Sequence, residues 1–311
     1  MNPLLRDRIR GALVGCAAGD ALGAGYEFGP PLAPDVAVRM RGGGAFHWAP
    51  GEWTDDTSMA VAIAEVAAQS SLTDEAALDR LVGRWVEWAA SAPDVGHQTS
   101  AVLGGVTPGP GAAAAARAAA RTLHERTGHT AGNGALMRTA PIALAHLDDP
   151  AGLACTARAV GELTHWDPDS GDACVLWGLA ERHAVLTGEL DVRVGLEHLP
   201  IHRRTGWAGR LAAAEQATPA DFEHNGWVVH ALQGAWSAIH RTGGELPAAL
   251  ADAVRGGRDT DTVAAIAGTL VGAARGESAV PAAWREALHG WPGRTGSELG
   301  DLAEQVARRV S

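Results

Sequence analysis

The stretch from Arg258 to Gly268 reads Arg-Asp-Thr-Asp-Thr-Val-Ala-Ala-Ile-Ala-Gly. Acidic residues in a first turn, followed by an alanine-rich apolar run, are typical of a helix start. The same pattern occurs about two hundred residues earlier, where Trp-Thr-Asp-Asp-Thr at residues 53–57 opens a second such run. If the fold brings these two helix starts together, their carboxylates repel one another unless divalent cations lie between them. The pair therefore predicts a helical protein with a metal site built from oxygen ligands.

Working outward from these two segments, apolar residues recur with a helical period along nearly the whole chain, and strand-like alternation is almost absent. The expected helices cover residues 5–23, 56–69, 74–90, 97–105, 111–125, 134–146, 151–162, 170–186, 227–241, 247–254, 261–275, 281–289 and 297–309. Residues 29–50 and 188–225 are expected to be less regular. We therefore predict an all-α fold, with a single compact multi-helix domain over residues 1–311.

A stripe of four glycines marks the first predicted helix, at Gly11, Gly15, Gly19 and Gly23. A spacing of four places them on nearly one helix face. Each glycine costs about 0.5–1 kcal/mol relative to alanine inside a helix. The repetition therefore indicates that another backbone, or a ligand, approaches closely along this face, with tight helix packing as the simpler explanation.

Composition limits the class of protein. The chain has 311 residues, 46% of them hydrophobic, which is enough to bury a large core. No apolar run reaches the roughly 20 residues that span a bilayer, and the first residues do not have the layout of a signal peptide, so we expect a cytoplasmic protein that is not bound to a membrane. The formal charge of −11 makes nucleic-acid binding an unfavoured function.

The three cysteines, Cys16, Cys155 and Cys174, lie in apolar helical patterns without a CxxC pair. We interpret them as buried small hydrophobic residues, because neither a zinc site nor a disulfide framework has this spacing.

The two acidic helix starts have a simpler interpretation when each is taken alone. Thr54 would cap free backbone donors, and the acids beside it would favour the positive end of the helix. The presence of two such turns changes this balance, since together they supply four carboxylates and two hydroxyls. That set is sufficient for two cations about 3.5–4 Å apart, with positions left open for water and substrate.

Several motifs now occur in an order that resembles one family. Residues 10–15 read Arg-Gly-Ala-Leu-Val-Gly, residues 19–28 read Gly-Asp-Ala-Leu-Gly-Ala-Gly-Tyr-Glu-Phe, and the two acidic turns follow. Between them stand Asp-Val-Gly-His-Gln-Thr at 94–99, Gly-Asn-Gly-Ala-Leu-Met-Arg at 132–138, Thr-His at 164–165 and Gly-Trp-Val-Val at 226–229. Each motif is weak alone. The ordered set is similar to the ADP-ribosylglycohydrolase family, and most similar to its bacterial dinitrogenase reductase-activating branch.

The resemblance implies an all-helical enzyme with a binuclear magnesium or manganese centre, which cleaves the bond between ADP-ribose and a modified side chain and releases ADP-ribose. It implies metal ligands at Thr54, Asp55, Asp56, Asp259, Asp261 and Thr262. Glu27 would act as an acid, a base or a water-orienting group, whereas a solvated loop acid is its simpler interpretation. Asp94 would face the scissile bond and the acceptor guanidinium, which suits a carboxylate. Its simpler interpretation is a turn after a proline.

The substrate contacts that the resemblance implies lie at Asn133, Gly134, His165, Trp227 and His97. His97 and Trp227 replace the asparagine and tyrosine usual in the branch, so acceptor preference and ligand contacts stay open. Asn133 would otherwise cap a helix, and His165 would otherwise be a structural histidine.

A tryptophan beside a motif, namely Trp53, Trp166 or Trp227, is a candidate for stacking on the adenine, with packing in the core or at the rim as the alternative.

Several functions remain open on the sequence. The preferred substrate is an ADP-ribosylated protein whose arginine carries the modification. The same fold would serve an ADP-ribosyl serine, an ester or a modified nucleotide equally well. A non-catalytic protein that binds ADP-ribose, a structural crystallin-like protein and an immunity protein against a transferase toxin form a different class. Loss of metal ligands would be expected in such a protein, and all six positions here carry suitable side chains.

Overall fold

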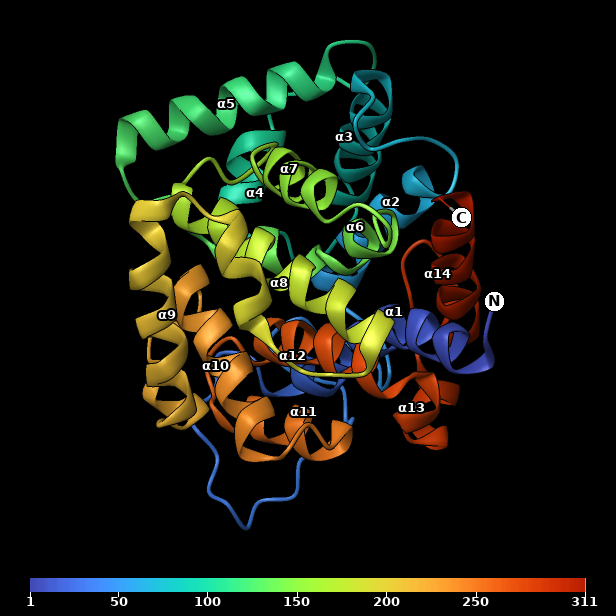
Figure 1. Ribbon diagram of the computed structural model, residues 1–311, viewed down its shortest axis with the longest axis vertical. Coiled ribbons are helices and arrows are strands. Elements are labelled where there is room, and N and C mark those ends of the chain that lie inside the picture. Colours follow the sequence, from blue (N-terminus) through green and yellow to red (C-terminus); the bar gives the residue numbers. More distant parts are fainter. Residues whose placement is uncertain (311) are drawn as a thin grey trace.

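The computed structural model describes residues 1–310, and α-helices account for most of them (Figure 1). The helices are α1 (Pro3–Gly23), α2 (Asp55–Ala67), α3 (Glu75–Ala89), α4 (His97–Leu103), α5 (Ala112–Thr127), α6 (Ala140–Leu144), α7 (Pro150–Gly161), α8 (Pro168–Thr187), α9 (Ile201–Glu215), α10 (Val228–Arg241), α11 (Leu246–Arg255), α12 (Thr260–Arg275), α13 (Ala282–Ala287) and α14 (Gly296–Val310). The described strands are β1 (His289–Gly290) and β2 (Arg294–Thr295), which pair antiparallel. The predicted all-α fold is confirmed.

Short 3₁₀ helices occupy several connections: η1 (Ala24–Tyr26), η2 (Asn133–Arg138), η3 (Val192–His198), η4 (Pro219–Asp221) and η5 (Glu277–Ala279). Over residues 1–310, no helix combines the length and the apolar character that a bilayer span requires.

Helices α1 and α12 form the tightest pair in the molecule and run antiparallel through its middle (Figure 1). The glycine stripe of α1 is the reason. A Cβ at Gly11, Gly15 or Gly19 would overlap backbone atoms of α12. Gly268 of α12 has the same relation to α1. The prediction that another backbone approaches this stripe is therefore confirmed, and it has a consequence for the site, because a Cβ at Gly23 would overlap Asp261.

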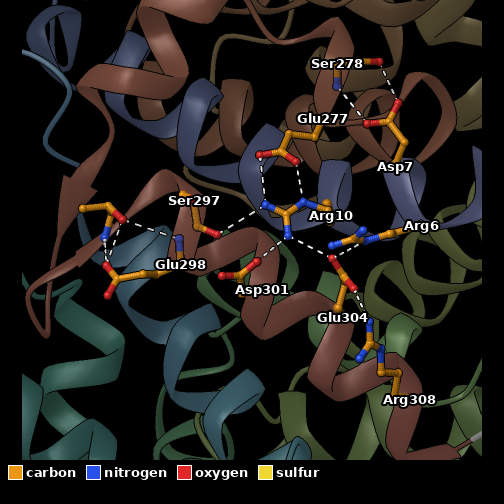
Figure 2. A network of polar contacts seen from close by, with 11 residues as sticks. Arg6, Asp7, Arg10, Glu277, Ser278, Ser297, Glu298, Asp301, Glu304 and Arg308 are labelled. Carbon is orange, nitrogen blue, oxygen red and sulfur yellow. Dashed lines mark hydrogen bonds and ion pairs between the residues drawn. The ribbon is translucent and has the colours of Figure 1, made fainter. Parts of the chain in front are cut away.

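At the Gly11 end of the same pair, charges add to the close backbone contact and link α1 to η5 and α14. Figure 2 shows the Arg10 guanidinium of α1 among carboxylates of η5 and α14. Its Nη1 lies 2.5 Å from Asp301 and 2.9 Å from Glu304, and its Nε donates to Glu277. This network fastens the carboxyl-terminal helix to the first one (Figure 2).

Three expectations differ from the structure. Residues 201–215 form the regular helix α9 inside the segment predicted to be less regular. Residues 134–146 are not one helix, because a 3₁₀ segment ends at Arg138 before α6 begins. Cys155 is exposed, since it lies on the solvent side of α7, whereas Cys16 and Cys174 are buried as expected. The three cysteines are free thiols.

Candidate metal centre and catalytic cavity

The two acidic helix starts meet, as the sequence predicted. Asp261 belongs to three sets of carboxylates, and within each set the oxygens lie within 4.8 Å of one another. Its partners in these sets are Asp20 with Asp56, Glu27 with Asp259, and Asp55 with Asp94. Two helix amino termini, that of α2 and that of α12, therefore converge with the end of α1 on one acidic cluster.

Asp20 of α1 organises the start of α2. Its Oδ1 accepts a hydrogen bond from the Thr54 backbone at 2.9 Å. Its Oδ2 accepts from the Thr57 backbone at 3.0 Å and from the Thr57 hydroxyl at 2.6 Å. A side chain from another helix therefore satisfies the free donors that an N-cap residue usually serves. The Thr54 hydroxyl makes no capping bond and lies 3.1 Å from Asp56 and 3.4 Å from Asp261.

Burial and mutual repulsion disfavour the charged state of these acids. Both causes raise the pKa of Asp56 and of Asp261 well above the ordinary value, burial being the larger. Burial, followed by the charges of Asp259 and Asp94, raises the pKa of Glu27 to about 9. Burial and then Asp259 raise the pKa of Asp94 to about 6. No arginine forms an ion pair with this cluster in the described part of the chain.

The donor set fits a divalent cation. Three carboxylate oxygens of the cluster, one each on Glu27, Asp56 and Asp261, are buried without a hydrogen-bond partner. Buried polar atoms are ordinarily satisfied, so each of these oxygens lacks a partner that a cation would provide. Every available donor is a hard oxygen from a carboxylate or a threonine hydroxyl, which suits Mg²⁺, Mn²⁺ or Ca²⁺ better than a metal that prefers sulfur.

A cavity of about 500 Å³ opens above the carboxylates. The predicted site residues among those that line it are Glu27, Asp55, Asp94, His97, Asn133, Gly134, His165, Asp259, Asp261 and Thr262. Thr54 and Asp56 lie behind this surface and are almost fully buried. The chain positions predicted from separate motifs therefore share one site.

Trp227 has a different place from the other predicted contacts. It is 37% exposed and lines a neighbouring hollow of about 550 Å³. That hollow shares Gln98, Gly132 and Gly226 with the main cavity, so the two adjoin one another. Trp53 is 1% exposed and donates from Nε1 to the Trp291 carbonyl at 3.3 Å, which is core packing.

Asn133 joins the two sides of the cavity rather than capping a helix. Its Nδ2 donates to the Asn225 carbonyl at 2.9 Å and to Asp259 Oδ2 at 2.7 Å, and it makes no side-chain capping bond. Asn225 in turn accepts from the Asp259 backbone through its Oδ1 at 3.2 Å and donates to the Gly257 carbonyl. These two amides fix the turn that carries Asp259.

A small aromatic chamber adjoins the cavity. It has a volume of about 100 Å³, and four tryptophans line it, namely Trp48, Trp53, Trp88 and Trp291. Glu52, Asp55 and Asp94 supply carboxylates, and no basic side chain of the described chain lines the chamber. Asp55 and Asp94 also line the main cavity, so they form the boundary between the two spaces. We call this space the tryptophan chamber.

Asp20 and Asn225 are two site residues that the sequence analysis did not assign. Asp20 stood in the quoted glycine-rich motif, and a carboxylate inside an otherwise apolar helix was an available signal, because such a group is rarely buried without a partner. Asn225 gave no comparable signal, since it lies in a short connection between η4 and α10.

Comparison with known proteins identifies the family of this chain. The family model described as ADP-ribosylglycohydrolase matches residues 1–311. The chain is 30% identical to the ADP-ribosyl-[dinitrogen reductase] glycohydrolase of Rhodospirillum rubrum, with 92% of each protein covered. It is also 30% identical to the ADP-ribosylarginine hydrolase Tri1 of Pseudomonas putida (strain GB-1), over 96% of this chain and 80% of that protein.

A solved structure described as an ADP-ribosylglycohydrolase-related protein complex has the same fold, with a TM-score of 0.75, 29% identity and full coverage of both chains. Human ADP-ribosylhydrolase ARH3 is more distant, at 25% identity over 97% of this chain and 93% of that protein. The chain therefore belongs to the ADP-ribosylglycohydrolase family and is a hydrolase of glycosidic bonds.

Proposed function

We propose that this enzyme hydrolyses the N-glycosidic bond between ADP-ribose and an arginine side chain of a modified protein, and releases ADP-ribose in the cytoplasm. Two divalent cations, Mg²⁺ or Mn²⁺, would be held by Thr54, Asp55, Asp56, Asp259, Asp261 and Thr262. When bound, such cations orient the ribose hydroxyls and make a water more acidic. The buried carboxylate oxygens without partners support this assignment.

The observation that carries the choice of arginine is the tryptophan chamber. Aromatic walls with three carboxylates and no basic side chain suit a planar cation, because indole faces attract guanidinium and carboxylates accept its hydrogen bonds. The chamber meets the main cavity at Asp55 and Asp94, beside the proposed metal ligands. A serine acceptor is neutral and makes no use of this chemistry. The name of the Pseudomonas putida relative also specifies an arginine linkage.

The chain's own acids have separate parts in this reaction. Asp55 and Asp94 both line the cavity and the chamber. Because Asp55 is assigned to the cations, Asp94 is the group left to give a proton to the leaving guanidine nitrogen. Glu27 lines the main cavity but not the tryptophan chamber. Glu27 is therefore the group we assign to accept the proton of the attacking water, as hydrolysis of a glycosidic bond through an oxocarbenium-like transition state requires.

The test is a panel of ADP-ribosylated peptides, modified on arginine or on serine, with free ADP-ribose as the readout. We expect release from the arginine peptide, loss of that release after treatment with EDTA, and recovery on addition of Mg²⁺ or Mn²⁺. Release from the serine peptide alone would overturn the acceptor assignment, and full activity after chelation would overturn the metal assignment.

A matched pair of variants tests the chamber itself. Trp48→Leu removes an aromatic wall and should raise KM for the arginine peptide roughly 5- to 30-fold, in line with a cation–π interaction of about 1–2 kcal/mol. Trp284→Leu, on α13 and away from the chamber lining, should leave KM unchanged. Equal KM values for both variants would show that the chamber does not bind the acceptor.

A further inference from the structure

Arg138, at the end of η2, is a buried cation that the proposed chemistry does not use. It is 1% exposed, and no carboxylate of the described chain forms an ion pair with it. Its guanidinium lies over the Trp85 ring at 4.1 Å, and Nη1 contacts the Met59 sulfur at 3.2 Å. Burying a guanidinium without a carboxylate is costly, so the remaining contact of this side chain calls for a functional reason.

That contact runs toward the catalytic cavity. Arg138 Nη2 donates to the Thr164 hydroxyl oxygen at 2.6 Å, and the same oxygen lies 2.8 Å from His165 Nδ1. Both Thr164 and His165 are almost fully buried. A guanidinium donates and never accepts, so Thr164 Oγ1 must accept from Arg138 and is left with its own hydrogen to place. Within the described chain, His165 Nδ1 is the acceptor that this hydrogen finds.

The direction of these two hydrogen bonds fixes the state of the imidazole. Because Nδ1 accepts from Thr164, it carries no proton, and the proton of the neutral ring stands on Nε2. Burial, followed by the charge of Arg138, lowers the pKa of His165 to about 3, so the ring is neutral at physiological pH. The opposite tautomer would leave the buried Thr164 hydroxyl hydrogen without an acceptor, which is unfavourable for a buried donor.

The Nε2 edge of His165 lies against two glycines of the cavity wall. A Cβ at Gly132 would lie 3.1 Å from Nε2, and a Cβ at Gly134 would lie 3.2 Å from it. Both glycines and His165 line the catalytic cavity. Nε2 has no hydrogen-bond partner among residues 1–310. The absence of side chains at these two positions therefore keeps this edge of the ring available to a ligand.

We propose that Arg138 is a positioning residue, which acts through the Thr164 hydroxyl to hold His165 as the Nε2–H tautomer and so presents a hydrogen-bond donor to an oxygen atom of ADP-ribose. The inference rests on the proposed function only in taking ADP-ribose as the ligand, and it does not depend on the acceptor side chain. Because Arg138 can only donate, the Thr164 hydroxyl donates to His165 Nδ1, and the Nε2–H of His165 is then the donor that faces the cavity.

The test uses the whole enzyme labelled with ¹⁵N on histidine, with ADP-ribose itself as the probe. We expect His165 to show an unprotonated Nδ1 and a protonated Nε2 throughout the neutral pH range, and the Nε2 signal to shift when ADP-ribose binds. Thr164→Val should mix the two tautomers and weaken ADP-ribose binding roughly tenfold, the value of a single hydrogen bond of about 1.4 kcal/mol. Thr164→Ser should restore both the tautomer and the affinity.

Arg138→Met removes the charge at similar volume and should reproduce the effect of Thr164→Val, with folding checked by circular dichroism. Thr156→Val is the matched control, because this buried threonine hydroxyl has no partner and lies in α7. It should leave both readouts unchanged. A wild-type ring protonated on Nδ1, or unchanged ADP-ribose affinity in Thr164→Val, would overturn the inference. Hydrolysis of a linkage other than arginine would overturn the proposed acceptor while leaving these binding results intact.

Discussion

The two ends of the α1–α12 pair each gather carboxylates, but only one end supplies a cation from the protein. At the outer end, Arg10 lies among Glu277, Asp301 and Glu304 (Figure 2). Hydrogen bonds from arginines lower the pKa of Glu304 against the effect of its burial. At the inner end, Asp56 and Asp261 are buried together, and their pKa values are raised.

The difference separates a structural acidic cluster from a functional one. A charge network that contains its own arginine is complete in the folded protein and needs no ligand. Carboxylates buried without a counter-charge destabilise the fold on their own, and they persist where a function uses them. The glycine stripe connects the two ends, because it fixes α12 against α1 and thereby sets how close the inner carboxylates come.

The largest expected effect comes from removing a carboxylate at the inner end of the helix pair. Asp56→Asn should lower kcat/KM by more than roughly 1000-fold, about 4 kcal/mol of transition-state stabilisation, because a proposed metal ligand is lost. The unfolding free energy of the metal-free variant should equal or exceed that of the wild type, since the substitution removes a buried acid whose ionisation the fold disfavours, as its raised pKa shows. Steady-state kinetics and urea unfolding in EDTA measure the two quantities.

The control for that variant lies at the outer end. Glu304→Gln should leave kcat/KM unchanged and lower the unfolding free energy, because Arg6 and Arg10 lose a partner that is almost fully buried. Asp56→Asn should therefore lower kcat/KM without destabilising the metal-free protein, and Glu304→Gln should destabilise the protein without lowering kcat/KM. If Asp56→Asn destabilised the metal-free protein as much as Glu304→Gln does, the inner cluster would be structural and the comparison would be wrong.

Much of this contrast could be predicted from the sequence. The helical period gave the all-α fold, and the two acidic turns predicted that Asp55, Asp56, Asp259 and Asp261 would meet. The glycine stripe indicated a close backbone, although not which one. The helix α9 was missed because Gly206 and Gly209 interrupt its pattern, and packing of Trp207 and Leu211 compensates for that in the fold.

Other parts of the site depend on relations between helices that a local pattern does not contain. Asp20 accepts its hydrogen bonds from α2, and nothing near it in sequence specifies that partner. The tryptophan chamber joins residues from 48 to 291, so its members are separate until the chain folds. Asn133, at the start of η2, is held by long-range bonds to Asn225 and Asp259, and nothing near it in sequence specifies these partners.

A smaller effect concerns a third buried acid, Glu181 of α8, which lies between the two ends of the pair. Thr139 donates to it at 3.0 Å, its second oxygen has no partner, and burial raises its pKa to about 8. In the folded protein it stays protonated above the pKa of the unfolded chain. The ionisation of Glu181 therefore has no effect on the unfolding free energy below about pH 4.5. Between about pH 5 and 7, this one group lowers the unfolding free energy by about 1.4 kcal/mol for each pH unit.

Glu181→Gln should remove this part of the slope, by about 3 kcal/mol between about pH 5 and 7. The measurement is the unfolding free energy of both proteins against pH in saturating Mg²⁺, so that the inner cluster contributes equally to each. Parallel pH profiles for the variant and the wild type would contradict a neutral buried Glu181.

The smallest effect returns to the outer end and tests whether the two ends are independent. Arg10→Gln should lower the unfolding free energy by about 2 kcal/mol, because a charged hydrogen-bonding centre is lost and Glu277, Asp301 and Glu304 are left to repel one another. Asp20 lies about 15 Å further along α1, at a rise of about 1.5 Å per residue. At that distance, kcat/KM and the Mg²⁺ requirement should stay at wild-type values. Added salt should recover part of the lost unfolding free energy, because it screens the exposed Asp301. A change in the Mg²⁺ requirement would mean that the charges at one end of the helix pair set the spacing of the carboxylates at the other.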